Sequence, residues 1–357
     1  MKHAVIMAGG SGTRFWPQSR KEMPKQFLTV TGDRSLIQST FDRCQPDIPA
    51  KRFWVVTNAV QAEATRLQLP EIPDSHILEE PCGRNTAPCI GLAAIQLLAE
   101  DPDAVMVVMP ADHVISPSAE FRKAIGHATR LIEQDPSRLV LFGVRPSYPA
   151  TGFGYIEQGE PLEGEGPGTH VASFREKPDA ETAQQYVDSG RFFWNCGIFV
   201  WRADTILNCL KEHEPEIHAC LQTLAPQVGT DQWPQTLADE FPQMKSISID
   251  HSVLERAENI CLLEAPFGWD DVGSWHALER LHPQDVHGNT IVGRHAGVDT
   301  TGCIIRGEPN HLIASLGVKD LIIVQTKDAT YVASRHDEDG IRRLIEQLRE
   351  SGHDQFL

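Results

Sequence analysis

The chain has 357 residues, of which 32 are Lys or Arg and 49 are Asp or Glu, so its formal charge is −17 with His counted neutral. This length allows about two domains of roughly 100 to 200 residues each. The negative charge argues against general binding of nucleic acids or anionic membranes, because affinity for phosphate backbones needs a basic face. A phosphorylated substrate would therefore have to bind where the local charge is positive.

Targeting and metal-binding patterns are missing from the sequence. No stretch approaches the ~20 apolar residues of a membrane-spanning helix, and the first residues (MKHAVIMAGG) lack the apolar core and cleavage site of a signal peptide. We therefore expect a cytoplasmic protein with no membrane partner. The eight cysteines are scattered, with no C-x-x-C pair and no Cys/His cluster at zinc spacing, which predicts reduced thiols.

Apolar runs alternate with amphipathic stretches over the first 145 residues, as in a parallel sheet covered by helices. The pattern predicts strands over residues 3–8, 53–57, 76–79, 104–109 and 139–144, and helices over residues 35–44, 59–68, 87–99 and 119–133. Open sheets of this kind bind ligands beyond the carboxyl ends of their strands, so the loops there should hold the functional residues.

The alternation breaks near residue 151, where Gly-rich turns and shorter strands suggest an antiparallel insertion on the edge of the first sheet. Helical pattern returns over residues 180–189 and over much of 203–237, and a strand is predicted over residues 260–265. The predicted fold class is thus α/β, with a Rossmann-like, mixed but mainly parallel sheet flanked by helices.

The C-terminal texture is different. Beyond residue 282, short β segments separated by Gly, Asn and Asp turns lead to a charged amphipathic helix over residues 338–350. We therefore predict a domain boundary near residue 283, with a catalytic domain over 1–282 and a small β-rich domain over 283–357. The turn spacing is roughly regular but too short to establish a repeat, so a small β-domain and a short β-helix both stay open.

A glycine-rich loop follows the first predicted strand in the segment AVIMAGGSGTRFWPQSRKEMPKQFL. It does not match the Walker A template G-x-x-x-x-G-K-[ST]. It also fails G-x-G-x-x-G, because Phe15 stands where the third glycine should be. Exposed backbone N–H groups of such a loop could cradle phosphates, although a purely structural turn is also open.

The residues behind this loop form a local basic patch. Four cations stand against one acid, a charge of +3 (4 minus 1), and the residues are Arg14, Arg20, Lys21, Lys25 and Glu22. Arg can clamp a phosphate through two hydrogen bonds and Lys supplies a point charge. A solvated charged loop is the alternative, but two prolines stiffen the segment and favour positioned charges.

The pattern G-G-x-G-T-R-x-x-P followed by P-K resembles the signature of the sugar-phosphate nucleotidyltransferases, which join a nucleoside triphosphate to a sugar 1-phosphate and release pyrophosphate. The forms FWPQSR and PKQFL are similar to the mannose-1-phosphate guanylyltransferase branch of that family. The resemblance implies the nucleotide-diphospho-sugar transferase fold. It also implies catalytic roles for Arg14 and Lys25, and nucleotide binding by Ala8, Gly9, Gly10, Gly12, Thr13 and Arg14.

The segment GRNTAPCIGLAA places Arg84 and Asn85 where a helix should begin. Capping of that helix by Asn85 would account for the pattern alone and is worth ~1 kcal/mol. The segment also resembles the nucleotide-recognition loop of guanylyltransferases, which implies nucleotide binding by Arg84 and Asn85. The two roles of Asn85 are compatible.

Carboxylates follow two apolar segments of the chain. In VMVVMPADHVI, Asp112 stands at the end of a central strand, where a carboxylate suits Mg²⁺. Asp270 and Asp271 stand in GWDDVGSW, and the family resemblance favours Asp271 as the second metal ligand. Asp112 would thereby also bind the nucleotide. A charge pair at a helix N-terminus is the alternative for the two adjacent acids.

Three stretches, TGFGYIE, FREKPD and FWNCGIFVW, resemble the sugar-binding segments of the family. The resemblance implies sugar-phosphate binding by Gly154, Glu176, Lys177 and Asn195. Carboxylate and amide groups can pair with sugar hydroxyls, and a lysine can reach the sugar phosphate. Outside the family context each of these residues would be a weak indication.

The resemblance therefore implies an enzyme that makes GDP-mannose from GTP and mannose 1-phosphate with Mg²⁺. The same chemistry with another nucleoside triphosphate or sugar 1-phosphate is the main alternative, and a catalytically silent nucleotide-sugar sensor is a second. By analogy with short relatives we also expect the C-terminal domain either to pack on the catalytic domain or to support a homodimer. The 75 residues from 283 to 357 are too few for the isomerase domain of longer relatives, so we expect no mannose-6-phosphate isomerase activity.

Overall fold

The computed structural model describes residues 1–10, 12–163, 166–337 and 340–357. They form two compact units. The first comprises Met1–Gly9, Thr40–Ala111 and Ile115–Trp269, and the second comprises Gly10–Ser39, Asp112–Val114 and Asp270–Leu357. The boundary predicted near residue 283 does not coincide with this division and stays a prediction.

The first unit is built on a nine-stranded sheet in the order β3-β2-β1-β4-β9-β6-β10-β8-β7. Its strands are β1 (Lys2–Met7), β2 (Phe53–Asn58), β3 (Ile77–Glu80), β4 (Val105–Pro110), β6 (Leu139–Val144), β7 (Tyr155–Pro161), β8 (Thr169–Arg175), β9 (Phe192–Arg202) and β10 (Ile260–Glu264). The first four strands pair in parallel, and β10 pairs in parallel with β6. The predicted α/β class with a mixed sheet is confirmed.

The sequence predicts that the antiparallel insertion lies on the edge of the sheet, but one of its strands lies inside the sheet. β9 lies between β4 and β6 and pairs antiparallel with both. Its sequence (FFWNCGIFVWR) is mostly apolar and most of its residues are buried, so it lacks the alternation of a half-exposed strand. A continuous apolar run is typical of a central strand. The Gly-rich turns that precede this run in the sequence favour an edge position instead.

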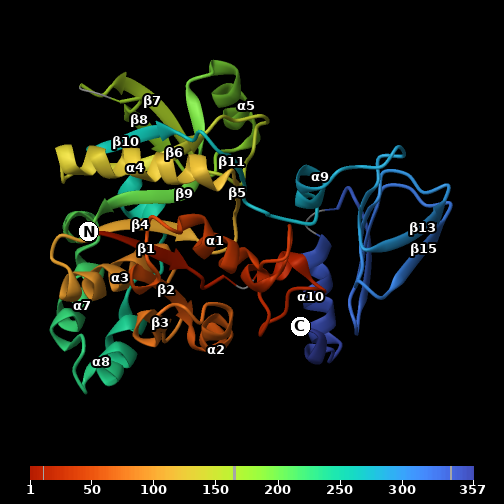
Figure 1. Cartoon of the computed structure of the whole chain (residues 1–357), viewed down its shortest axis with the longest axis horizontal. Helices are drawn as coiled ribbons and strands as arrows, with labels where there is room; N and C mark the ends of the chain where they lie inside the picture. The colour runs from red at the N-terminus through yellow and green to blue at the C-terminus, as the bar shows by residue number, and fades with distance from the viewer. Residues whose placement is uncertain (11, 164–165, 338–339) are drawn as a thin grey trace. The chain divides into compact units, whose positions relative to one another are not determined.

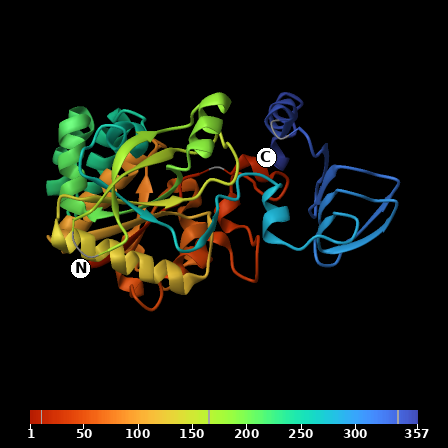
Figure 2. The same cartoon turned by 90° about the horizontal axis from the view of Figure 1, so that it is seen from above.

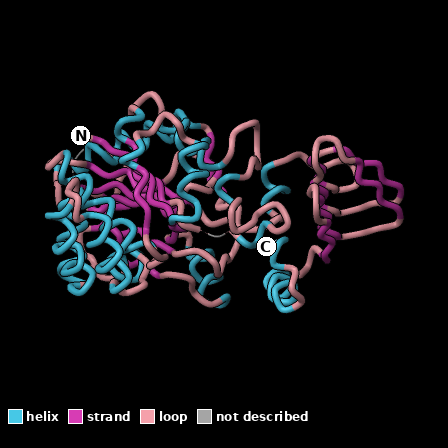
Figure 3. The backbone as a smooth tube through the Cα atoms, turned by 90° about the horizontal axis from the view of Figure 1, so that it is seen from below, coloured by secondary structure: helices cyan, strands magenta, loops and turns pink. Residues whose placement is uncertain are grey.

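Helices cover both faces of this sheet (Figure 1). α3 (Thr86–Glu100), α6 (Ala203–His213) and α7 (Pro215–Leu224) share one apolar core with the strand face that includes Leu141. α4 (Ser118–Gln134) contacts β6 and β9 on the opposite face. The helices run alongside the strands in Figure 3. Among the described residues, the other α-helices are α1 (Leu36–Cys44), α2 (Ala59–Gln68), α5 (Ala180–Ser189), α8 (Trp233–Glu240), α9 (Ala277–Leu281) and α10 (Gly340–Glu350).

The second unit contains stacked coils of short β-strands, drawn in blue in Figure 2. Its strands are β12 (Thr290–Val292), β13 (Arg294–Val298), β14 (Ile304–Arg306), β15 (Leu312–Leu316), β16 (Leu321–Gln325) and β17 (Thr330–Ser334), and the short strands β5 (Val114–Ser116) and β11 (Gly268–Asp270) lie outside this stack. β12, β14 and β16 pair in parallel, and so do β13 and β15. Ile304 pairs with Ile322 and Arg294 with Leu312, so one coil takes 18 residues (322 minus 304), as in a short β-helix.

The glycine-loop segment is anchored in the second unit by two aromatic side chains. Phe15 lies 4.9 Å from the ring of Trp275, and the indole N–H of Trp275 donates to the Trp16 carbonyl at 3.2 Å. Trp16 also meets Tyr331 edge-on, with 6.0 Å between ring centroids. The buried side chains of Phe15 and Trp16 therefore hold the loop in place. The cations that follow them in the chain are positioned as a result.

Two sequence expectations about termini and thiols can be compared with the structure. Residues 338–339, which begin the predicted last helix, lie outside the described residues, and α10 covers the rest of it. All eight cysteines are free thiols, as predicted. Among the residues that the structure describes, no helix is both long and apolar enough to cross a membrane.

Candidate active site

Lys25 is the centre of the charged cluster in the second unit. Its side chain is only 8% exposed, and its Nζ lies 2.8 Å from the Asp112 carboxylate. The same Nζ donates to the backbone carbonyl of Asp271 at 2.6 Å. The structure thus brings together three residues that the sequence predicted separately, from the glycine-loop segment, the end of β4 and the GWDDVGSW segment.

Gly12 allows the backbone of the loop to approach Lys25. Its φ is +58°, a left-handed conformation that favours glycine. A Cβ at this position would lie 2.4 Å from the Lys25 Cβ and 2.5 Å from the Lys25 backbone nitrogen. Gly12 is therefore required for the packing of Lys25, whatever its own amide binds.

The two predicted metal ligands have opposite electrostatic surroundings. Burial works to raise the pKa of Asp112, but the charges of Lys25 and His113 and the Lys25 hydrogen bond outweigh it, so the pKa is lowered. Burial raises the pKa of Asp271, with Asp270 adding to the effect and Lys25 opposing it. A cation placed between these acids would favour both ionised forms.

The neighbouring acid Asp270 is already engaged. Its Oδ1 accepts from the Val272 amide at 2.8 Å and from Nη2 of Arg280 at 2.9 Å. Asp270 therefore shapes the turn before Gly273, which leaves Asp271 as the carboxylate able to hold a metal ion.

The protein side chains supply only part of the ligands that a Mg²⁺ ion needs. Among the described residues, no group of three or more His, Cys, Asp or Glu side chains could hold a metal ion. One or two carboxylates completed by substrate phosphates and water are the usual magnesium arrangement, and Asp112 and Asp271 supply carboxylates of that chemical type. The site suits a metal that arrives with, or binds beside, a phosphorylated substrate.

Arg14 and Thr13 lie on the surface beside this cluster, in the 3-10 turn Thr13–Phe15. The charge of Arg14 acts to lower the pKa of Asp271, opposing the effect of burial, so the guanidinium lies near that carboxylate. An exposed guanidinium next to a predicted metal ligand is positioned to contact phosphate.

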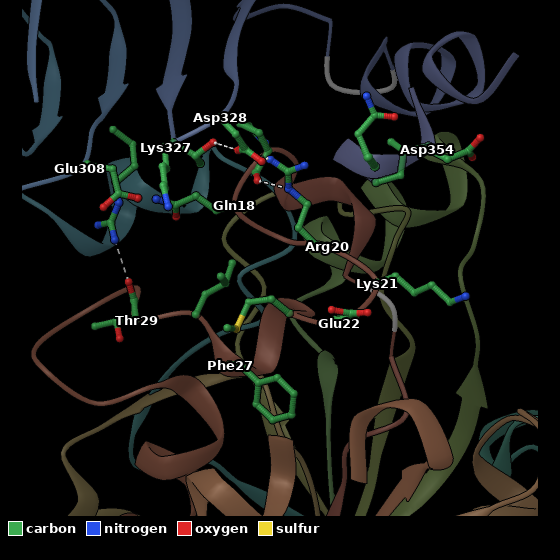
Figure 4. A pocket seen from close by; sticks show the side chains of 17 residues that line it. Gln18, Arg20, Lys21, Glu22, Phe27, Thr29, Glu308, Lys327, Asp328 and Asp354 are labelled. Atoms are coloured by element: carbon green, nitrogen blue, oxygen red, sulfur yellow. Dashed lines mark hydrogen bonds and ion pairs between the residues drawn. The ribbon is translucent and has the colours of Figure 1, made fainter. Parts of the chain in front are cut away.

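Two cations of the predicted basic patch have another place. Arg20 and Lys21 line a cavity of about 730 Å³ in the second unit (Figure 4). Arg20 donates from Nε to the Pro17 carbonyl at 2.8 Å and pairs with Asp328 at 2.8 Å. Lys25 does not line this cavity. The patch therefore divides, and Arg20 is held by structural contacts.

In the first unit the strand that precedes the glycines ends at a buried position. The Ala8 amide donates to the Val56 carbonyl, and the Thr57 hydroxyl donates to the Ala8 carbonyl at 3.1 Å. Gly9 and Gly10, which follow, are exposed. The backbone therefore leaves the sheet edge where a phosphate could reach it, which suits the predicted role of this loop.

Glu80, at the end of β3, is a functional candidate that the sequence did not reveal. Its side chain is 5% exposed, and its Oε2 would lie 3.4 Å from a Cβ placed on Gly9. Burial raises the pKa of Glu80 to about 7, although the Cys89 thiol donates a hydrogen bond to it. Within the described residues, Oε1 of Glu80 has no hydrogen-bond partner. A buried acceptor beside the glycine loop is suited to a ligand donor.

Arg84 and Asn85 precede α3, as predicted. Asn85 caps the helix, because its Oδ1 accepts from the Thr86 amide at 2.8 Å, and its exposed side chain keeps its amide nitrogen for other contacts. Arg84 donates through Nη2 to the carbonyl of Pro242. Both residues therefore have structural contacts, and their predicted nucleotide binding stays a prediction.

The four predicted sugar-binding residues lie together in the first unit. The Asn195 amide donates to the Gly154 carbonyl at 2.8 Å, and a Cβ on Gly154 would lie 2.5 Å from Oε2 of Glu176. Lys177 pairs with Glu176 at 2.8 Å and is 61% exposed. The sequence missed Asp250, whose Oδ1 accepts from Nδ2 of Asn195 at 2.9 Å.

Comparison with known proteins extends the resemblance over nearly the whole chain. A family model described as Nucleotidyl transferase matches residues 3–287, and one described as MannoseP isomerase/GMP-like beta-helix domain matches residues 293–348. The chain is 38% identical over 356 residues to mannose-1-phosphate guanylyltransferase 2 of Escherichia coli O157:H7, covering 97% of this chain and 73% of that protein.

Solved structures agree with these matches. A protein described as mannose-1-phosphate geranyltransferase from Thermus thermophilus has a TM-score of 0.87 and 32% identity, covering 98% of this chain and 99% of that one. A mannose-6-phosphate isomerase from Helicobacter pylori has a TM-score of 0.61 and 26% identity, covering 76% of this chain and all of that one (100%). That similarity does not test isomerase activity here, and its expected absence stays a prediction.

Proposed function

The chain belongs to the nucleotidyl transferase family, and we propose that it transfers GMP from GTP to α-D-mannose 1-phosphate, giving GDP-mannose and pyrophosphate. Sugar-phosphate nucleotidyl transfer is the activity of the family branch that its relatives represent. The observation that carries the proposal is the contact of Lys25 with both Asp112 and Asp271. A buried cation that bonds the carboxylate of Asp112 and the backbone carbonyl of Asp271, behind a glycine loop, suits transfer between phosphates.

Catalysis in this proposal consists of positioning and charge neutralisation. The phosphate of a sugar 1-phosphate is already anionic near neutral pH, because the second pKa of a phosphate monoester is about 6. Its oxygen attacks the α-phosphorus of the nucleotide, the bond to the β-phosphate breaks in line, and pyrophosphate leaves. No general base is needed. Arg14 and Lys25 stabilise the charge that develops on the α-phosphate and on the departing pyrophosphate.

Asp112 and Asp271 are the residues that would hold Mg²⁺. When bound, the ion supplies positive charge against the phosphate oxygens. Lys25 fixes the spacing of the two acids, because one amine bonds the carboxylate of Asp112 and the backbone of Asp271. Lys25 therefore has two tasks: it contributes charge and it positions the acids.

The choice of guanine is supported by the chemistry at the end of β3. Guanine presents N1–H and an N2 amine as donors, and a carboxylate can accept from both. Glu80 is buried with one oxygen unpartnered among the described residues, so a donor pair would satisfy it. We include Arg84 and Asn85, next along the chain, as the predicted remainder of this recognition loop.

The sugar half of the proposal uses Gly154, Glu176, Lys177 and Asn195. Glu176 and Asn195 offer acceptors and donors for hydroxyl groups, and the exposed amine of Lys177 is free to move from Glu176 to a phosphate. A Cβ at Gly154 would lie 2.5 Å from Oε2 of Glu176 and 3.1 Å from Cζ of Phe174, so a side chain there would displace the Glu176 carboxylate. A hexose phosphate fits these groups, and mannose is the sugar that the named relatives support.

One assay tests the whole proposal. Pyrophosphate release is measured for the 357-residue chain over a matrix of four nucleoside triphosphates and several sugar 1-phosphates, with and without Mg²⁺. We expect the highest kcat/KM for GTP with mannose 1-phosphate and little turnover without a divalent cation. A higher kcat/KM with another pair would reassign the substrates, and no turnover with any pair would support a silent sensor.

We also propose that the protein acts in the cytoplasm as a homodimer, with residues 1–282 as the catalytic domain and 283–357 as a β-rich domain. Support for self-association comes from exposed apolar side chains on two β-helix strands: Val298 on β13, and Leu312 and Leu316 on β15, are more than half exposed. Light scattering coupled to gel filtration measures the mass directly. A monomer at micromolar concentration would contradict the dimer.

A further inference from the structure

A π-helical turn, Asp250–Leu254, joins the two substrate loops of the first unit. On the nucleotide side, the Ile249 amide donates to the Thr86 hydroxyl at 2.8 Å. The Ala87 amide donates to the Ile247 carbonyl at 3.1 Å. The residues just before the turn are thus bonded to the start of α3, directly behind Arg84 and Asn85.

On the sugar side, the same turn bonds two of the predicted sugar-binding residues. Oδ1 of Asp250 accepts from Nδ2 of Asn195 at 2.9 Å. Glu255 closes the turn, and its Oε1 accepts from the Glu176 amide at 3.3 Å. Residues 247–255 therefore hold both loops in one hydrogen-bonded frame.

The turn is rigidly anchored. Ile249, Val253 and Leu254 are fully buried in the core that α3 and α6 share, and the Ser252 amide donates to the Ser248 carbonyl at 3.0 Å. π-helical turns are rare overall, but those that do occur are often found at functional sites. Here the first residue of the turn, Asp250, is half-buried and directed at Asn195.

Asn195 keeps one acceptor site on Oδ1 and one hydrogen on Nδ2 for a ligand, because each atom already makes one hydrogen bond among the described residues. Its Oδ1 accepts from the Gly197 amide at 3.1 Å, and one hydrogen of its Nδ2 goes to Asp250. A carboxylate, in contrast, can accept about four hydrogen bonds, and Asn195 uses one on Asp250. Asp250 therefore has more unused hydrogen-bond acceptor sites for a ligand than Asn195 has.

The charges around Asp250 favour a neutral donor. Burial raises the pKa of Asp250 to about 6, and the negative charge of Glu176 adds to that effect, while Lys177 and His251 oppose it. Two carboxylates that share a confined site repel each other unless donors lie between them. Hydroxyl groups of a sugar are donors of this kind, and they carry no charge that Lys177 would repel.

We propose that Asp250 is a specificity-determining residue of the sugar site, which accepts a hydrogen bond from a ring hydroxyl of the sugar 1-phosphate beside Glu176. The inference rests on the proposed function, since it assumes that Glu176 and Asn195 face the sugar. It adds a residue that binds the sugar directly. It also gives the π turn a role, because the turn aims that carboxylate and ties the sugar loop to the nucleotide loop.

The test compares Asp250→Asn and Asp250→Ala with the wild-type chain. Asp250→Asn keeps an oxygen for Asn195 but replaces the other acceptor by an NH₂ donor. We expect the KM for mannose 1-phosphate to rise by roughly 10- to 100-fold, the scale of a lost hydrogen bond to a charged group, while the KM for GTP changes by less than about threefold. Asp188→Asn is the matched control, because its carboxylate bonds only Gln184 on exposed α5 in the described contacts, and it should behave as wild type.

Deoxy substrates separate direct binding from bracing. Calorimetry measures the affinity of wild type and Asp250→Ala for mannose 1-phosphate and for each of its monodeoxy analogues. Direct contact predicts one analogue for which the two proteins bind equally, because the hydroxyl that Asp250 bonds is already missing. An equal loss for every analogue, or an equal rise in the KM for GTP, would mean that Asp250 only braces Asn195, and the inference would be overturned.

The failure of this inference can be told apart from the failure of the proposed function. Wild-type turnover with GTP and mannose 1-phosphate, together with unchanged sugar affinity in Asp250→Asn, would refute the role of Asp250 alone. Calorimetry that detects no sugar phosphate binding by wild type would refute both. Circular dichroism spectra of both variants that match wild type establish that the changes are local.

Discussion

The amine of Lys25 lies 2.8 Å from the carboxylate of Asp112, and both residues belong to the second unit although 87 positions (112 minus 25) separate them in the chain. Because the lysine is almost fully buried, its charge has few partners other than this acid and the Asp271 carbonyl. A buried cation held in this way needs no reorganisation when negative charge develops nearby. The fixed pair therefore suits the stabilisation of a phosphate transition state.

The first prediction concerns this amine. Lys25→Ala should lower kcat at least ~10²-fold, which is the scale for removal of a single transition-state charge. Pyrophosphate release at saturating substrates measures it. Lys123→Ala is the matched control, since Lys123 lies on the surface of α4 and pairs only with Glu120 among the described contacts. Turnover near that of wild type in folded Lys25→Ala protein would remove Lys25 from the mechanism.

A second prediction separates two adjacent acids. Asp271→Asn should lower kcat at least ~10²-fold and raise the Mg²⁺ concentration needed for half-maximal rate, because it removes a proposed ligand. Asp270→Asn should change the rate less than about tenfold, since Asp270 bonds Arg280 and the Val272 amide. Magnesium titrations of the rate for both variants provide the measurement. Equal effects of the two substitutions would argue against the choice of Asp271.

Position along the chain explains which site residues could be predicted from the sequence. Asp112 follows an apolar run that is plainly a buried strand, so its carboxylate is expected at the sheet edge where ligands bind. The glycine loop before Lys25 was recognisable for the same reason. In both cases a local sequence pattern was enough to predict where a candidate site residue would lie in the fold.

Glu80 and Asp250 show why the rest could not be predicted. Glu80 stands in a Glu-Glu-Pro sequence typical of an exposed turn, and it is buried only because β3 packs beside the loop after β1. Asp250 bonds Asn195, which is 55 residues away, through a π turn that no periodicity reveals. Tertiary packing made both residues candidates. The central position of β9 was hidden likewise, because pairing between distant strands decides it.

A third prediction is the pH dependence of stability at Glu80. Burial raises its pKa from 4.5 to about 7 in the folded chain, so the folded state holds the proton more tightly than the unfolded state. The stabilisation by the bound proton is complete below about pH 4.5 and is lost as the pH rises to about 7. The loss amounts to roughly 3 kcal/mol, at about 1.4 kcal/mol per pKa unit.

Glu80→Gln removes this dependence while it keeps the shape of the side chain. Urea unfolding of wild type and variant at several pH values between about 5 and 8 should show the variant gaining relative stability as the pH rises. Parallel stability curves for the two proteins would mean that the pKa of Glu80 is not raised in the folded chain.

The last prediction concerns base selection by the same carboxylate. Donors on guanine bond best to the ionised acid, so binding of GTP should release a proton from Glu80, and the KM for GTP should rise as the pH falls below about 7. In Glu80→Gln one acceptor becomes an NH₂ donor that meets the donors of guanine. The ratio of kcat/KM for GTP to that for ATP should therefore fall by about tenfold or more, and its pH dependence should disappear. Glu79→Gln is the control, because the adjacent, partly exposed carboxylate of Glu79 bonds Arg66 instead. An unchanged GTP-to-ATP ratio in Glu80→Gln would return base selection to Arg84 and Asn85.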